Sequence, residues 1–261
     1  MNLEVKMTTF IVILLLIIMP TASESQTINA HVGKQNIYLD SGKVTRGLTP
    51  PGGTDVYDIR FSKHGTFERL VFEIRDTTDD KPSGTPCFFE VTYEQYPFRL
   101  VVDLDNTRLQ FSADFPNFSN SDYISGKYYL PSETSGNYKF ALTLKKPIKF
   151  EVFELHNPGR IVIDIKAGDQ REKDFPPVYS LRSKSYYFDD LRDQEDKMEL
   201  ENVRIIKSQD KKYVIEEGYY KTAQEAMERK DLFIEKGIEL FVEKRRANEL
   251  PKGKVISQPN K

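Results

Sequence analysis

The chain has 261 residues, of which 38% are hydrophobic and 30% are charged, and its formal net charge is -2. This composition is typical of a globular protein long enough for two modest domains. Because Lys and Arg are not in excess, the chain lacks the basic character of a protein whose main partner is nucleic acid, and we expect no nucleic acid partner. The single cysteine, Cys87, excludes an intrachain disulfide, so the fold must depend on its hydrophobic cores.

The N-terminus indicates the compartment. An unbroken apolar run at residues 10–19 follows Lys6 and precedes small residues up to Ser25, which is the order of a secretory signal peptide. The run is shorter than the roughly 20 residues that a membrane-spanning helix needs. We therefore expect residues 1–25 to be cleaved on export, leaving a periplasmic or otherwise exported protein without a membrane span. An uncleaved membrane anchor is the alternative.

A pattern of three strands occurs twice after a lead-in at residues 26–54. The strand PFRLVVDLD (97–105) returns as PGRIVIDIK (158–166), and in both the apolar side chains alternate as they do in a strand with one buried face. Two apolar strands precede each copy: RLVFEI and FFEVTY before the first, YKFALTL and KFEVFEL before the second. Since neither unit can bury its face alone, we expect residues 55–167 to form a β-sandwich by internal duplication.

One long insertion, residues 114–137, interrupts this pattern. It carries five aromatic residues among serines and asparagines: Phe115, Phe118, Tyr123, Tyr128 and Tyr129. An insertion of this length inside a compact domain is either functional or without fixed structure. Aromatic and short polar residues suit contact with carbohydrate, and packing over the end of the sandwich is the alternative interpretation.

The twofold order of strands, each ending in the pattern PxRxVxDx, resembles the AMIN domain of secreted bacterial cell-wall amidases and of some pilus secretins. The resemblance implies a sandwich of two related sheets that localises a protein to the envelope or septum by contact with peptidoglycan. Arg99 and Arg160 of the two copies have two interpretations. They could form structural ion pairs with Asp103 and Asp164, or they could bind carboxylates of peptidoglycan.

A linker at residues 168–177, with charges, a glycine and prolines, separates a second domain at 178–246. Its pattern indicates two β-α-β halves, and the second helix has the clearer ends, with Thr222 and Glu225 as a capping box and Gly237 as the terminator. We expect a small α+β domain of the ferredoxin-like type, βαββαβ, with both helices on one face of the sheet. The polar tail, residues 247–261, is expected to be disordered.

The segments LRSKSYY (181–187) and VIEEGYYKTAQEAMERKDLFIEKGIELFV (214–242) resemble the SPOR domain, which binds peptidoglycan glycan strands that lack stem peptides, as at a division septum. The resemblance implies that a sheet face without helices is exposed and binds the glycan. Polar groups and an aromatic platform suit a sugar. The candidate peptidoglycan-binding residues are Arg182, Ser185, Tyr187, Arg204, Val214 and Glu216.

No catalytic motif is present. The histidines, His31, His64 and His156, do not have the spacing of metal ligands, and the chain contains no nucleophile elbow or nucleotide-binding glycine loop. We expect no enzyme activity, no metal and no cofactor. The sequence predicts a non-catalytic cell-envelope protein that binds peptidoglycan during cell division or cell-wall remodelling, with envelope or division proteins as further candidate partners. The alternative is a protein-binding adaptor for an envelope assembly such as a pilus secretin or division complex.

Overall fold

A computed structural model of the chain describes residues 27–48, 52–108, 113–132, 136–198, 200 and 202–253. The expected signal peptide therefore lies outside the described residues. Within the described part, no helix has the length and apolar character needed to cross a membrane.

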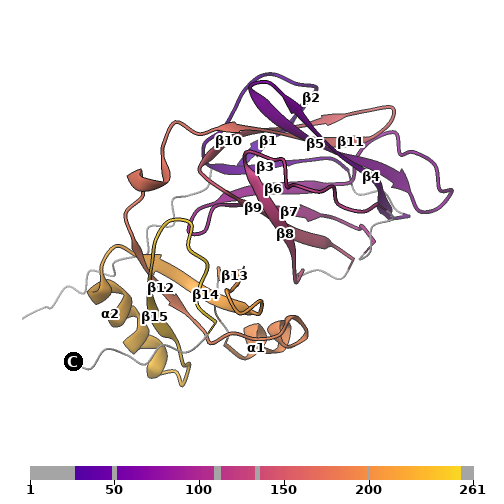
Figure 1. Cartoon of the computed structure of the whole chain (residues 1–261). Helices are drawn as coiled ribbons and strands as arrows, with labels where there is room; N and C mark the ends of the chain where they lie inside the picture. The colour runs from indigo at the N-terminus through magenta and orange to yellow at the C-terminus, as the bar shows by residue number, and fades with distance from the viewer. Residues whose placement is uncertain are drawn as a thin grey trace, which may run out of the picture.

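Two sheets face each other in the first part of the chain (Figure 1). In spatial order, the first sheet consists of β1 (Thr27–Asn29), β3 (Gly42–Arg46), β6 (Phe89–Glu94), β7 (Arg99–Leu104), β9 (Tyr138–Leu144) and β8 (Ile124–Leu130). The second consists of β2 (His31–Val32), β10 (Ile148–Leu155), β11 (Arg160–Ala167), β5 (Phe67–Asp76) and β4 (Thr54–His64). The short strands β1 and β2 pair in parallel with their neighbours, and the other pairs are antiparallel.

The two sequence copies exchange strands between these sheets. In the first copy β6 and β7 form a hairpin, and in the second copy β10 and β11 form one. The hairpin of each copy pairs with the remaining strand of the other copy, β7 with β9 and β11 with β5. Both hairpins turn through a cis peptide bond, at Tyr96–Pro97 and Asn157–Pro158. The copies are consequently interlocked, and each sheet contains strands of both.

The main core lies between the two sheets and is built from the alternating apolar residues of the repeated strands. The buried side chains include Leu70, Phe72, Ile74, Leu100, Val102, Leu104, Phe140, Leu142, Ile161, Ile163 and Ile165. Alternation with period two places all of them on the inner faces, so their burial supplies most of the apolar stabilisation of this part. Cys87 is fully buried in the same core, as a small apolar residue would be.

The insertion at residues 114–137 closes one end of this core. Phe118 is buried in it, and the ring of Phe115 packs edge-on against Phe72 and Phe140 at centroid distances of 6.3 and 5.1 Å. Tyr128 is buried too, in a separate cluster. Tyr129 is the exposed aromatic residue, at 43%. The packing interpretation therefore holds for most of these rings.

A third sheet follows, with the antiparallel order β13 (Arg204–Lys207), β14 (Tyr213–Tyr220), β12 (Val178–Arg182) and β15 (Phe241–Arg245). Helix α2 (Ala223–Ile234) begins as predicted, since Thr222 and Glu225 form the capping box, and Gly237 follows its end with φ of 76°. A second, shorter helix, α1 (Leu191–Met198), continues from a 3-10 turn at Phe188–Asp190, and another such turn spans Glu172–Asp174.

The predicted fold class, a β-sandwich followed by a ferredoxin-like α+β domain, is wrong for the chain. The described residues are mostly β, with three sheets and two α-helices, and a βαββαβ domain with several helices is not what they show. The reason lies in the charged segment DDLRDQEDKMEL, in which Leu191 is the only buried helical residue. With no wide apolar stripe, it forms only a short helix.

The predicted disorder of the tail is also wrong for residues 247–253. Ala247 is 1% exposed, and Asn248 Nδ2 donates to the carbonyl oxygens of Leu144 and Lys145, at 3.1 and 3.2 Å. This segment therefore returns to the sandwich and ties the third sheet to it. Residues 254–261 lie outside the described residues.

Candidate functional site

The third sheet joins the sandwich through a shared apolar cluster. Val101, Tyr128, Leu130 and Ala141 of the first sheet pack in one cluster with residues of the C-terminal part: Leu191, Ile205, Tyr213 and Ile215. Phe175, in the expected linker, packs edge-on against Phe98 at 5.0 Å between ring centroids. Buried apolar contact of this kind fixes two parts against each other more firmly than a polar interface does.

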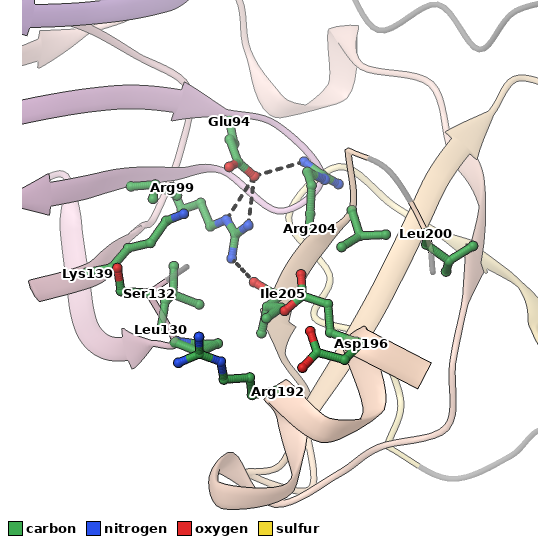
Figure 2. A pocket seen from close by; sticks show the side chains of 14 residues that line it. Glu94, Arg99, Leu130, Ser132, Lys139, Arg192, Asp196, Leu200, Arg204 and Ile205 are labelled. Carbon is green, nitrogen blue, oxygen red and sulfur yellow. Dashed lines mark hydrogen bonds and ion pairs between the residues drawn. The ribbon is translucent and has the colours of Figure 1, made fainter. Parts of the chain in front are cut away.

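A charge network crosses the same junction (Figure 2). Glu94 and Arg99 are paired across the β6–β7 hairpin, and Glu94 Oε2 accepts from Arg99 Nε at 3.0 Å and Nη2 at 2.8 Å. The same oxygen accepts from Arg204 Nη1 of β13 at 3.2 Å. Arg99 Nη1 in turn donates to the carbonyl oxygen of Ile205 at 2.6 Å. One carboxylate is therefore held by an arginine from each side of the junction.

The network continues into the third sheet through Glu216 of β14. Its carboxylate accepts from Arg204, Arg245 and Ser180. Arg204 also donates to the carbonyl oxygens of residues 95 and 96, at 2.7 and 3.0 Å, and Arg245 donates to that of Tyr96 at 3.1 Å. The hairpin turn of the sandwich thus sits on charged side chains of the third sheet.

The arginines keep both carboxylates ionised. Burial opposes the charge on Glu94, but Arg99 and Arg204 more than offset it and lower the pKa of this carboxyl. Burial also opposes the charge on Glu216, and Arg204 and Arg245 likewise lower its pKa. Each carboxylate gains more from its guanidinium partners than it loses by leaving water.

Four of the predicted peptidoglycan-binding residues lie at this junction or behind it. Arg182, Val214 and Glu216 are fully buried, and Arg182 forms an ion pair with Glu243. Arg204 is partly buried and occupied by Glu94 and Glu216. The expectation that this sheet face is exposed is wrong. The hairpin turn of the sandwich lies against Arg204 and Arg245, and the backbone of Lys252 in the C-terminal segment donates to Glu243, the partner of Arg182. In this arrangement the face does not offer these side chains to a polymer.

The other two candidates lie away from the network. Ser185 Oγ lies 2.7 Å from Asp210 Oδ2 and 2.8 Å from the carbonyl oxygen of Gly253, so its one proton is donated to one or the other and the side chain lies between the tail and the sheet. Tyr187 is 64% exposed, and Lys212 Nζ lies 4.2 Å from its ring centroid. Tyr187 is the one predicted residue whose ring is open to solvent.

The two arginines of the repeat differ from the expected pairing. Arg99 is paired with Glu94, not with Asp103, and is 1% exposed, so its role in the fold is structural. Asp164 is bound by Arg69, at 2.6 Å, and by Lys34, at 2.6 Å, rather than by Arg160. Arg160 is half-buried, and its Nε lies 3.4 Å from the carbonyl oxygen of residue 158.

Beside the charge network a groove of about 420 Å³ opens between the sandwich and α1 (Figure 2). This volume lies within the roughly 300–1,000 Å³ of ordinary ligand pockets. Strands β7, β8 and β9 form one wall with the loop after β8, and α1 with β13 forms the other. The described lining residues are Glu94, Arg99, Val101, Leu130, Pro131, Ser132, Lys139, Arg192, Glu195, Asp196, Leu200, Val203, Arg204 and Ile205.

Four charged lining residues stand outside the network: Lys139, Arg192, Glu195 and Asp196. Lys139 Nζ lies 3.8 Å from Asp103, at the long end of an ion pair. Figure 2 shows Lys139 and Arg192 on the left of the opening and Asp196 on the right. Sequence patterns do not single these residues out, because a charged helix face is ordinarily just solvated.

The groove is the candidate site because it combines enclosure with charged groups at the meeting of two parts of the chain. Among the residues that the structure describes, no group of three or more His, Cys, Asp or Glu is arranged to hold a metal ion. No protein-family model matches the chain, and no curated protein matches it significantly. The resemblances to AMIN and SPOR domains therefore rest on the quoted sequence segments.

Proposed function

We propose that the chain is a non-catalytic, exported protein of the bacterial cell envelope that binds peptidoglycan, in cell division or wall remodelling. The quoted sequence segments support the choice of polymer, since both resemble modules that act at the cell wall. The observation that carries the proposal is the groove at the junction, which both parts of the chain are needed to form. The wall polymer, made of sugars and charged peptides, offers groups of the kinds that such a groove binds.

The proposal moves the contact away from the predicted sheet face. Because Glu216 is fully buried and its partners Arg204 and Arg245 hold the hairpin turn of the sandwich, a glycan strand would have to separate the two parts to reach it. Separation would expose the apolar cluster and break several charge-assisted hydrogen bonds, each worth about 1.5–3 kcal/mol. Binding at the groove needs no such step.

Weak binding is sufficient for such a protein. A few hydrogen bonds of about 0.5–1.5 kcal/mol each, reduced by the cost of association, give affinities in the micromolar range or weaker. A repetitive wall offers many equivalent sites, so a weakly binding protein still concentrates on it. A function in localisation or recruitment follows from this more readily than one in catalysis.

The test is co-sedimentation of the purified protein with isolated peptidoglycan sacculi, with an insoluble polysaccharide such as cellulose as the matched control polymer. We expect saturable pelleting with sacculi and none with cellulose. Recovery of the protein in the supernatant at every amount of sacculi would refute the proposal. Retention of envelope proteins by the immobilised chain, without pelleting on sacculi, would identify it as an adaptor.

A further inference from the structure

We propose that the groove at the junction binds a ligand that carries both a carboxylate and an ammonium group, as the free ends of a peptide do, rather than a neutral sugar. The stem peptide of peptidoglycan is the natural source of such groups, and only this identification rests on the proposed function.

The charges at the groove are balanced and divided. Glu94, Arg99 and Arg204 are engaged with one another in the network below the opening. Beyond them the groove presents one exposed cation, Arg192, and one exposed carboxylate, that of Asp196. A ligand with one charge of each sign complements this set, whereas a purely anionic or purely cationic ligand would face like charges on one side.

The two charged residues of α1 are the most available. Arg192 and Asp196 are exposed, and neither makes an ion pair in the described part of the chain. They are four residues apart on one helix, a spacing at which opposite charges can pair with each other. In the structure they do not, so both remain open to a ligand in the groove.

The apolar part of the lining argues against a sugar. It consists of aliphatic side chains, among them Val101, Leu130 and Leu200, and none of the described lining residues is aromatic. A sugar ring is usually held by an aromatic platform together with hydroxyl partners. Aliphatic walls between charged groups suit the short aliphatic side chains of a peptide instead.

The test uses isothermal titration of the purified protein with three probes. The first is a soluble tetrapeptide with a free amino group and a free carboxylate, the second is the same peptide acetylated and amidated, and the third is an uncharged N-acetylglucosamine tetramer. We expect heat of binding only with the first probe. Asp196→Asn and Arg192→Gln are each expected to weaken it about tenfold, the loss of one charge-assisted contact at a partly exposed site.

Two matched variants keep the charge changes but place them elsewhere. Asp231→Asn on α2 and Arg246→Gln after β15 alter exposed residues that do not line the groove, and they should leave binding unchanged. The inference is overturned if the charged peptide does not bind, or if the blocked peptide or the sugar binds as tightly as the charged peptide. It is also overturned if Asp196→Asn and Arg192→Gln bind the charged peptide as tightly as the two control variants do.

The outcomes separate this inference from the proposed function. Charge-dependent peptide binding without pelleting on sacculi would leave the inference standing and refute peptidoglycan binding. Pelleting on sacculi without any binding of the charged peptide would support peptidoglycan binding and refute the inference that the groove binds a charged peptide.

Discussion

Replacing Glu216 by Gln is the sharpest test of the charge network at the junction. Glu216 is 0% exposed, and its carboxylate neutralises two guanidinium groups, those of Arg204 and Arg245. Gln keeps the shape of the side chain but leaves Arg245 buried without this counter-charge, while Arg204 retains Glu94. Removal of one partner from a buried pair costs about 3–5 kcal/mol. Because Arg204 keeps its contact with Glu94, we expect the free energy of unfolding to fall by about 3 kcal/mol, the lower end of that range.

Urea denaturation followed by circular dichroism measures this loss. A decrease of that size should lower the urea midpoint by about 1–1.5 M for a slope of roughly 2–3 kcal/mol/M. Glu228→Gln, which alters an exposed glutamate of α2, is the matched control and should stay within about 0.5 kcal/mol of the unaltered chain. If Glu216→Gln is no more destabilising than this control, the network does not hold the two parts together.

The same carboxylates predict the direction of the acid response. Because the pKa values of Glu94 and Glu216 are lowered in the folded chain, the unfolded chain binds more protons as the pH falls below about 4.3. Their contribution to the free energy of unfolding is complete above that pH and is lost as the pH falls through the folded-state pKa. Glu216→Gln should reduce this dependence, as measured by urea midpoints between pH 3 and pH 7.

Three further predictions concern the fold around the site. Asp164→Asn removes the buried carboxylate held by Arg69 and Lys34 and should lower the urea midpoint; an unchanged midpoint would show that this pair contributes nothing. Burial raises the pKa of the Cys87 thiol to about 11, so a thiol reagent at pH 8 should react only after urea is added, and rapid reaction without urea would contradict its burial. Thr222→Ala should cost about 1 kcal/mol through loss of the cap of α2, and Thr222→Ser, which keeps the hydroxyl, should restore most of it.

The repeated strands of the sandwich can be predicted from the sequence because they are short and strongly alternating, and because a proline precedes the last strand of each copy. The alternation of Leu100 and Val102, and of Ile161 and Ile163, identifies the inner faces correctly. The exchange of strands between the two copies could not be predicted from the sequence. Pairing of β7 with β9 or with a strand of its own copy would bury the same side chains, so the apolar pattern does not distinguish the two arrangements.

The buried face of the third sheet was misjudged for a physical reason. Charged residues that alternate along a strand usually face water, and Arg182 and Glu216 follow that pattern. Here they are buried because each has an opposite charge within reach on another strand: Arg182 pairs with Glu243, 61 residues away, and Glu216 pairs with Arg245, 29 residues away. Pairing at such separation has no local signature.

The sequence of α1, the helix that lines the groove, gives even less indication of a binding site. Arg192 and Asp196 belong to a charged segment whose composition indicates only an exposed helix. Their significance comes from the strands of the sandwich opposite them, which a sequence pattern does not place. The N-terminus of α2, by contrast, is fixed by Thr222 and Glu225, which lie within one helical turn of each other, and this capping box was predicted correctly.

The central claim, that the cell wall is bound at the junction groove, is tested most directly by amide hydrogen exchange of the protein with and without an excess of soluble peptidoglycan fragments. Binding at the groove predicts slower exchange in α1, residues Leu191–Met198, and in the loop after β8, with no change in α2. Slower exchange confined to α2 or to β4, with α1 unchanged, would contradict the claim and place the contact on another surface.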